Sequence, residues 1–229
     1  MAKPATQKNP GSEKTKMDSV TTTFVADWVR DRVRRGRMVP GQRLIEADLI
    51  NETGASRSRV REALQRLETE GLIAIEEFRG ASVRRFSREE LSAIYRTRAA
   101  LEGLAAADFA GLATADNKQA IIEAQSALDA AVAAGDHDAF ARSNDTWHCL
   151  IIEGCGNPYV IQFVDRLRVP VSRLLFSSFH SRQRLDDANA DHRAITCAIV
   201  NGDVESAERL MRNHVDAGFQ ALVSQGLDE

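Results

Sequence analysis

The sequence predicts a mainly α-helical protein in two parts: a small N-terminal unit of helices with one β-hairpin, and a larger all-α unit. Two observations carry this prediction. Hydrophobic residues follow a helical period in the N-terminal part, change to a strand-like pattern over 72–85, and then return to a helical period. The charge divides at the same point, because residues 1–86 carry 17 Lys and Arg against 12 Asp and Glu, whereas residues 87–229 carry 13 against 21.

The N-terminal unit is expected to span residues 18–86, after a polar, Lys-rich tail over 1–17 that we expect to be disordered. Helices are expected over 18–36, over 46–53 and from the N-cap Ser56 to Gly71, with strands over 72–76 and 81–85. Gly80 permits a tight turn between the two strands. Three helices followed by a hairpin are typical of a winged helix-turn-helix.

Residues 87–229 show no further strand pattern and are expected to form an antiparallel bundle of about six helices. Ser87 and Glu90 match a capping box that begins the first helix, and Thr114 can cap the second. The helices are expected over about 88–112, 115–134, 136–153, 158–178, 186–200 and 203–225.

The composition narrows the classes of protein. An apolar fraction of 43% with 28% charged residues is that of a soluble globular protein. No apolar run approaches the roughly 18–20 residues that span a bilayer, so no membrane partner is expected. Cys149, Cys155 and Cys197 form no CxxC pair, which favours reduced thiols and a cytoplasmic location. Residues 1–86 are net basic and residues 87–229 are net acidic, which indicates a polyanionic partner for the N-terminal unit alone. Such an uneven distribution of charge is also common in proteins without a polyanionic partner.

The helix after Ser56 separates an apolar face from a basic one. At about 100° per residue, one face carries Val60, Ala63, Leu64 and Leu67, and the neighbouring face carries Arg57, Ser58, Arg61 and Gln65. A helix whose first turn enters the major groove reads guanine with Arg and reaches phosphates with small hydroxyls. This pattern predicts DNA contacts by Ser56, Arg57, Ser58 and Arg61, and by Arg79 and Gly80 at the hairpin tip.

The alternative for this helix is an ordinary surface helix whose arginines pair with acids. Glu62, Glu68 and Glu70 are available for such pairs. Because they lie mostly in the later part of the helix, we expect Arg57 and Arg61 to remain unneutralised. Arg59 lies on another side of the helix and is expected to contact a flanking phosphate or solvent, and Arg66 is expected to pair with an acid.

The run RGRMVPGQRLIEADLINETGASRSRVREALQRLETEGLIAIEEFRGASV is similar to the DNA-binding domain of the GntR family of bacterial transcription regulators. The matching elements are G-x-x-x-P-G-x-x-L-x-E, S-R-x-x-V-R-E-A-L-x-x-L-x-x-E-G-L and R-G-A-x-V. The resemblance implies base or phosphate contacts by Arg57 and Arg61 and a homodimer that binds an inverted-repeat operator in double-stranded DNA.

Three of the five histidines lie on apolar faces of separate predicted helices: His148, His192 and His214. A single such histidine is usually a core residue. Three on facing helices can meet at one metal ion, since imidazole is the commonest protein metal ligand. Asn144, one turn before His148, or alternatively Asp145, can add an oxygen ligand.

Arg98 falls within the inward stripe of the helix over 88–112. A buried guanidinium needs an anionic partner. Arg98 either pairs with Glu102, four residues on, or faces the bundle cavity and binds the carboxylate of a ligand. Arg173 is a weaker candidate for the same role, and Tyr95 is either core or pocket wall.

The segments NDTWHCLIIEGCGNP and DHRAITCAIVNGDVESAERLMRNHV resemble the FCD effector domain of the FadR subgroup of GntR regulators, in the VanR-like branch. The resemblance implies that His148, His192 and His214 bind zinc, nickel or a similar divalent ion, with Asn144 where many members have Asp. It also implies a small organic acid as effector. We therefore expect a cytoplasmic transcription regulator, such as a repressor, and no enzyme; the alternatives are a metal-dependent hydrolase or a protein-interaction module.

Overall fold

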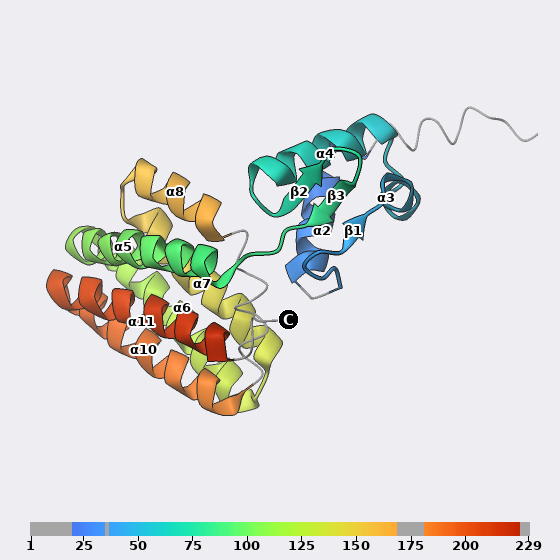
Figure 1. Cartoon of the computed structure of the whole chain (residues 1–229). Coiled ribbons are helices and arrows are strands. Elements are labelled where there is room, and N and C mark those ends of the chain that lie inside the picture. Colours follow the sequence, from blue (N-terminus) through green and yellow to red (C-terminus); the bar gives the residue numbers. More distant parts are fainter. Residues whose placement is uncertain (1–19, 35–36, 169–180, 225–229) are drawn as a thin grey trace, which may run out of the picture. The chain divides into compact units, whose positions relative to one another are not determined.

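A computed structural model describes residues 20–34, 37–168 and 181–224 (Figure 1). The chain divides between Arg85 and Phe86 into two compact units. The expected disordered tail over 1–17 and the candidate Arg173 lie outside the described residues. The structure is mainly helical with one small sheet, which confirms the predicted fold class.

The first unit combines three helices with a three-stranded antiparallel sheet in the order β1-β3-β2. Its helices are α2 (Thr22–Arg34), α3 (Glu46–Thr53) and α4 (Arg57–Thr69), and its strands are β1 (Arg43–Leu44), β2 (Ile73–Glu76) and β3 (Gly80–Val83).

The sequence predicted only the hairpin of β2 and β3, so the two-stranded expectation was wrong. In β1, Arg43 is paired with Ser82 and Leu44 with Ala81. Two residues are too few to show a period of two, and their partners lie almost forty positions away. Local patterning therefore gave no signal for this strand.

Helix α4 is fixed on the unit's core by its apolar stripe. All four stripe residues, Val60, Ala63, Leu64 and Leu67, are buried, as predicted. Arg30 of α2 also donates to both carboxylate oxygens of Glu70, at 2.9 and 2.6 Å, directly after α4. These contacts hold α4 with the basic face, which lies beside the apolar stripe, exposed to solvent.

Leu67→Ala is expected to lower the free energy of unfolding of the first unit by about 2–5 kcal/mol, because a fully buried leucine leaves a cavity when truncated. Hydrogen exchange of the amides in α2 and α4 measures this change. The control Gln65→Ala, at an exposed position of the same helix, is expected to stay within about 0.5 kcal/mol. Equal effects of the two variants would contradict the packing assigned to α4.

The second unit contains six helices among its described residues, in agreement with the predicted number. They are α5 (Arg88–Leu112), α6 (Ala115–Ala134), α7 (His137–Gly154), α8 (Pro158–Arg168), α10 (Arg182–Asn201) and α11 (Val204–Ser224). Helix α10 begins earlier than expected, and residues 169–178 of the fourth expected helix lie outside the described part. None of the described helices has the length and apolar character to cross a membrane.

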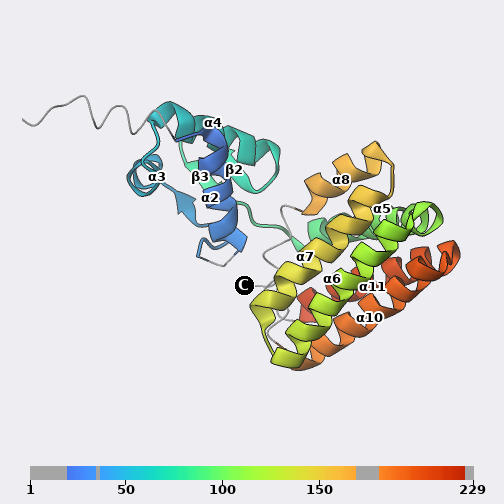
Figure 2. The same ribbon diagram turned by 180° about the vertical axis from the view of Figure 1, so that it is seen from behind.

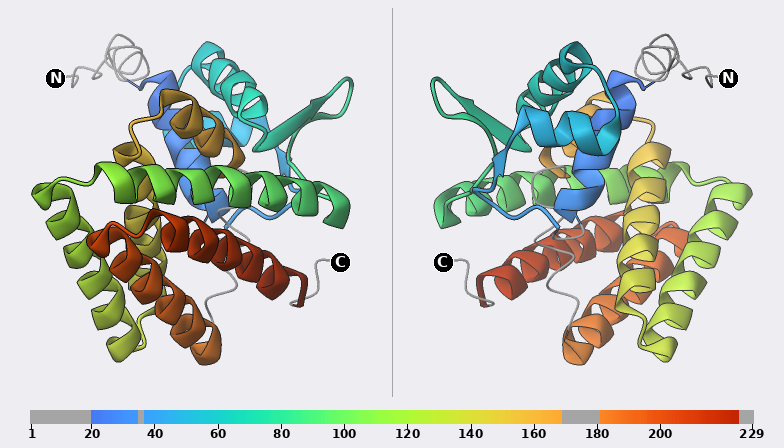
Figure 3. Two further views of the ribbon diagram at one scale, coloured as in Figure 1. Left: turned by 90° about the vertical axis from the view of Figure 1, so that its left-hand side faces the viewer. Right: turned by 90° about the vertical axis from the view of Figure 1, so that its right-hand side faces the viewer.

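Helices α6, α7, α10 and α11 lie side by side (Figure 2), and α5 runs along α11 (Figure 3). The capping box of Ser87 and Glu90 is present, and the Thr114 side chain accepts from the Asn117 amide. In the core, the fully buried Trp147 donates to Thr196 Oγ1 at 3.0 Å, which joins α7 to α10. The inward faces of α5, α7, α10 and α11 meet around this tryptophan and the residues described next.

Candidate functional site

Three histidines from three helices converge in the core of the second unit. His148 lies on α7, His192 on α10 and His214 on α11, and all three are buried. One ring nitrogen from each lies within 4.8 Å of the others. His148 Nε2 and His214 Nε2 are 3.3 Å apart. The expectation that the three rings meet at one point is therefore met.

The nitrogen atoms of this cluster fit a divalent metal ion. Both ring nitrogens of His192 are buried without a hydrogen-bond partner in the described part of the chain, which is costly for a polar group. Burial, together with the nearby His214 and His148, lowers the pKa of His192 well below its usual range. The ring is therefore neutral near pH 7 and keeps a lone pair, which is the form of imidazole that zinc and nickel bind.

Two carboxylates lie behind two of these histidines. Glu102 Oε2 is 2.9 Å from His148 Nδ1, and Asp191 Oδ2 is 3.2 Å from His214 Nδ1. A carboxylate at Nδ1 favours a proton there and leaves Nε2 as a lone pair. The two Nε2 atoms then face each other as acceptors, an unfavourable arrangement that a cation in the cluster would relieve.

Arg98 adjoins the histidine cluster through Glu102. Its Nε and Nη2 atoms each lie 2.8 Å from Glu102 Oε1, and both side chains are almost completely buried. The structure thus contains the intrahelical pair, but Arg98 Nη1 remains buried without a hydrogen-bond partner among the described residues. The guanidinium keeps one donor group for an anion.

Tyr95 lies one turn before Arg98 and is buried beside it. Its ring centroid is 5.0 Å from the guanidinium carbon of Arg98. Burial raises the pKa of Tyr95 to about 12, against the opposing charge of Arg98, so the hydroxyl is neutral. This hydroxyl has no hydrogen-bond partner in the described part of the chain. Arg98 Nη1 and Tyr95 Oη are therefore two buried polar groups on neighbouring turns of α5 without a hydrogen-bond partner among the described residues.

Arg184 of α10 also lies near this site, and it was not among the residues predicted from the sequence. Burial lowers its pKa, and its charge also acts on Tyr95 and His192. The signal was present, because Arg184 precedes His192 by eight residues and therefore lies on the same face of α10. No such signal predicted that Asp191 lies beside His214, or that Glu102 lies beside His148, because in each case the two residues are on different helices.

Of the two proposed oxygen ligands, Asn144 is buried and Asp145 is half-buried, both on α7. Asn144 precedes His148 by one helical turn and lies on the same face. Asp145 is not part of the compact group of ligand atoms formed by the three histidines. Asn144 thus lies on the buried face of α7 that carries His148, and Asp145 lies at the partly exposed edge of that face.

The first unit presents a separate basic surface at the start of α4. Ser56 occupies the N-cap position, but its hydroxyl makes no capping bond and instead lies 3.0 Å from Ser58 Oγ. Arg57 is exposed and has no ion-pair partner among the described residues. Two hydroxyls bonded to each other and an exposed arginine at a helix N-terminus are suited to phosphate and base contacts.

Arg61 has an acidic partner, so the expectation that it would remain unneutralised was wrong. Its Nε atom donates to both carboxylate oxygens of Glu46, at 2.9 and 3.0 Å. The partner comes from α3, fifteen residues earlier, and therefore lies outside the spacing of three or four residues that reveals ion pairs within one helix. As expected, Arg66 pairs with an acid, Glu70, at 3.1 Å. Arg59 is exposed but lies 3.4 Å from Glu62, an acid that the prediction of a phosphate or solvent contact for Arg59 did not include.

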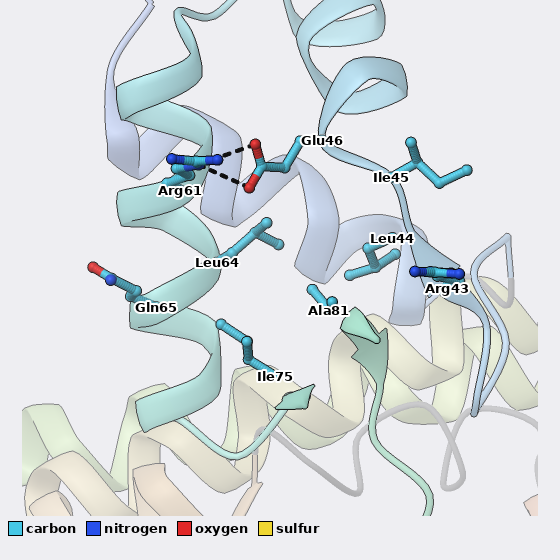
Figure 4. Close-up of a pocket in the computed structure, with 10 residues that line it drawn as sticks. Arg43, Leu44, Ile45, Glu46, Arg61, Leu64, Gln65, Ile75 and Ala81 are labelled. Atoms are coloured by element: carbon cyan, nitrogen blue, oxygen red, sulfur yellow. Dashed lines mark hydrogen bonds and ion pairs between the residues drawn. The ribbon is translucent and has the colours of Figure 1, made fainter. Parts of the chain in front are cut away.

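A pocket of about 510 Å³ opens next to Arg61. Figure 4 shows the Arg61–Glu46 pair on one side and Arg43 on another, with Leu44, Leu64 and Ala81 between them. Because Gln65 of α4 also lines it, the pocket belongs to the basic face of the helix. Its lining is aliphatic in the centre, with Arg43, Arg61 and Glu46 among the charged residues around it.

The hairpin tip carries the remaining predicted DNA contacts. Gly80 has φ of 81° and begins β3, and Arg79 is exposed and 3.1 Å from Glu76. Phe78, before Arg79, also has a positive φ of 64° and is 95% exposed. The tip is thus a tight turn that presents one arginine and one aromatic ring to solvent.

Comparison with known proteins identifies both units. The model of bacterial regulatory proteins of the gntR family matches residues 21–83, and the FCD domain model matches residues 93–217. The probable D-xylose utilization operon transcriptional repressor of Paenarthrobacter nicotinovorans is 30% identical over 88% of this chain and 90% of its own. The HTH-type transcriptional repressor GlaR of Escherichia coli K12 is 28% identical over 82% and 89%.

Solved structures agree with this fold. McbR/YncC of E. coli superposes with a TM-score of 0.79 at 22% sequence identity, and the match covers 89% of this chain and 97% of that one. The similarity therefore extends over both units and their order along the chain.

Proposed function

Because this chain belongs to the GntR family of bacterial regulatory proteins and carries an FCD effector-binding domain, we propose that a small carboxylate, bound beside a metal ion in residues 86–229, controls its affinity for operator DNA. The observation that carries this proposal is the buried group of three histidines and Arg98. A core of this kind has unused nitrogen ligands and an unused guanidinium donor side by side. Apolar packing alone does not require either.

In this proposal His148, His192 and His214 hold the metal ion, with Asn144 as an oxygen ligand. A zinc or nickel ion there would supply positive charge and a coordination site for a carboxylate oxygen. Arg98 Nη1 binds the same carboxylate from the side, and Tyr95 Oη provides a second donor. A small organic acid satisfies all of these groups at once, whereas an apolar ligand satisfies none.

In the first unit, Arg57 and Arg61 read base edges from α4, while Ser56 and Ser58 contact phosphates. The exposed Arg61–Glu46 pair is worth at most about 1 kcal/mol, so Arg61 can exchange it for a guanine edge. Arg79 and Gly80 at the hairpin tip approach the minor groove. A homodimer would place two copies of the first unit on the two halves of an inverted repeat.

The DNA-binding part of this proposal is tested with a duplex selected by the full-length protein from a random-sequence pool. We expect the selected duplex to bind at least about 10³-fold more tightly than a scrambled duplex at physiological salt, and the affinity to fall steeply as salt rises. Light scattering is expected to give two chains per duplex. Equal affinity for selected and scrambled duplexes would contradict sequence-specific recognition.

The two relatives described above are named as transcriptional repressors. The alternative, a metal-dependent hydrolase, has a separate test. The zinc-loaded protein is incubated with a panel of p-nitrophenyl esters and peptide amides. Turnover that disappears on addition of EDTA and in His192→Ala would support the hydrolase; we expect none above the background of the free metal.

A further inference from the structure

Glu102 occupies an unusual position between the two halves of the candidate site. It is completely buried on α5, and each of its oxygens lies close to a different group. Oε1 lies 2.8 Å from both Nε and Nη2 of Arg98, and Oε2 lies 2.9 Å from His148 Nδ1. A single carboxylate therefore contacts both a candidate metal ligand and the candidate anion-binding residue.

The contact with His148 decides which of its ring nitrogens carries the proton. Oε2 and Nδ1 are 2.9 Å apart but not aligned as a hydrogen bond. A carboxylate oxygen at this distance repels a lone pair on Nδ1, which favours the tautomer with the proton on Nδ1 and the lone pair on Nε2. Nε2 is the atom that faces His214, 3.3 Å away, in the histidine cluster. The opposite tautomer would direct an N–H group into the cluster and exclude a cation from His148.

The contact with Arg98 decides which part of the guanidinium remains available. Glu102 Oε1 occupies the edge formed by Nε and Nη2, and Nη1 has no hydrogen-bond partner within the described residues. An incoming anion can therefore meet Arg98 only from the Nη1 side. The positive charge of Arg98 in turn keeps Oε1 of Glu102 directed back along α5, toward residue 98.

We infer that Glu102 is a positioning residue that couples the metal site to the anion site, by fixing the tautomer of His148 with one oxygen and the orientation of Arg98 with the other. The inference rests on the proposed metal and effector function of the cluster. Its consequence is reciprocal: a change at Arg98 reaches the histidines through Glu102, and a change at His148 reaches Arg98.

Glu102→Gln tests the inference without changing the size of the side chain. Arg98 has only donors, so the new amide must turn its oxygen toward Arg98 and its NH₂ group toward His148 Nδ1. His148 then becomes an acceptor at Nδ1 and carries its proton on Nε2. We expect the affinity for Zn²⁺ to fall by about 10- to 100-fold, the usual effect of losing the outer partner of a ligating histidine.

The decisive variant combines Glu102→Gln with Arg98→Met. Without the guanidinium, the amide is free to turn its oxygen toward His148 and restore the original tautomer. We therefore expect the double variant to bind Zn²⁺ at least about fivefold more tightly than Glu102→Gln alone. A merely structural role for Glu102 predicts the reverse, because the second substitution removes another buried contact.

Two controls separate this route from general effects. Asp191→Asn changes the partner of His214. In the described part of the chain Arg98 pairs with Glu102 and not with Asp191, so adding Arg98→Met is expected to restore nothing there. Glu89→Gln, at an exposed position of α5, is expected to leave Zn²⁺ affinity within about twofold. Circular dichroism and melting temperature establish that each variant is folded.

The wild-type protein provides a measurement that no folding defect can obscure. Long-range ¹H–¹⁵N spectra of the metal-free protein are expected to show His148 as the Nδ1–H tautomer. An Nε2–H tautomer, or a double variant no tighter than the single one, would overturn the inference. A wild-type chain that binds no Zn²⁺ would instead refute the proposed metal site, and the tautomer would still decide the role of Glu102.

Discussion

His192→Ala is expected to weaken binding of Zn²⁺ by more than about 100-fold, beyond the range expected for residues that only support a ligand. His192 is completely buried, both of its ring nitrogens lack hydrogen-bond partners among the described residues, and burial lowers its pKa so that the ring is neutral. A neutral ring with unpartnered nitrogen atoms is the form in which histidine binds a metal ion. Competition titration against a fluorescent zinc chelator measures the affinity directly.

His137→Ala is the matched control for this prediction. His137 begins α7 and is not part of the compact group of ligand atoms, so its removal is expected to change Zn²⁺ affinity by less than about twofold. The same titration with Ni²⁺ shows which ion the site prefers. If His192→Ala and wild type bound Zn²⁺ equally, the histidines would be a packing feature and the metal proposal would be wrong.

The double substitution Arg57→Ala with Arg61→Ala is expected to weaken binding to the selected duplex by about 30- to 10⁴-fold, because each bidentate contact with guanine contributes about 1–3 kcal/mol. Binding to a scrambled duplex is expected to fall much less. The specificity ratio, measured by fluorescence anisotropy at one salt concentration, should therefore collapse.

The control removes the same charge from the same helix. Arg59 and Arg66 of α4 lie close to Glu62 and Glu70, respectively, and the interpretation assigns them no base contact. Arg59→Ala with Arg66→Ala is expected to reduce affinity for both duplexes alike and to keep the specificity ratio. If the two double variants behaved identically, α4 would act only through net charge, and the assignment of Arg57 and Arg61 as readers would fail.

The parts of the fold that rest on local patterns were predictable. The apolar stripe of α4 and the capping box at Ser87 are determined by residues three or four positions apart, and both are present in the structure. Strand β1 was not predictable in this way, because it has only two residues and exists through its pairing with β3. The same limit applied to Arg61, whose partner Glu46 lies on another helix.

The same distinction between local and long-range contacts applies to the candidate site. The inward direction of His148, His192 and His214 follows from the helical period, and the family resemblance indicated that they share one ion. The role of Glu102 did not follow, because its pairing with Arg98 is visible at a spacing of four, but its contact with His148 joins α5 to α7 across 46 positions. Contacts of that range depend on how the helices pack.

The regulatory claim is tested most directly by the affinity of the zinc-loaded, full-length protein for its selected duplex while small carboxylates are titrated. The panel contains acetate, L-lactate, L-malate, citrate and D-galactonate, with free Zn²⁺ held constant by a buffer. We predict that at least one carboxylate weakens DNA binding by about tenfold or more in wild type and has no effect in Arg98→Met, a coupling within the usual range for allosteric regulators. Equal DNA affinity at all carboxylate concentrations, or the same response in Arg98→Met, would contradict the proposed control of the DNA-binding unit by this site.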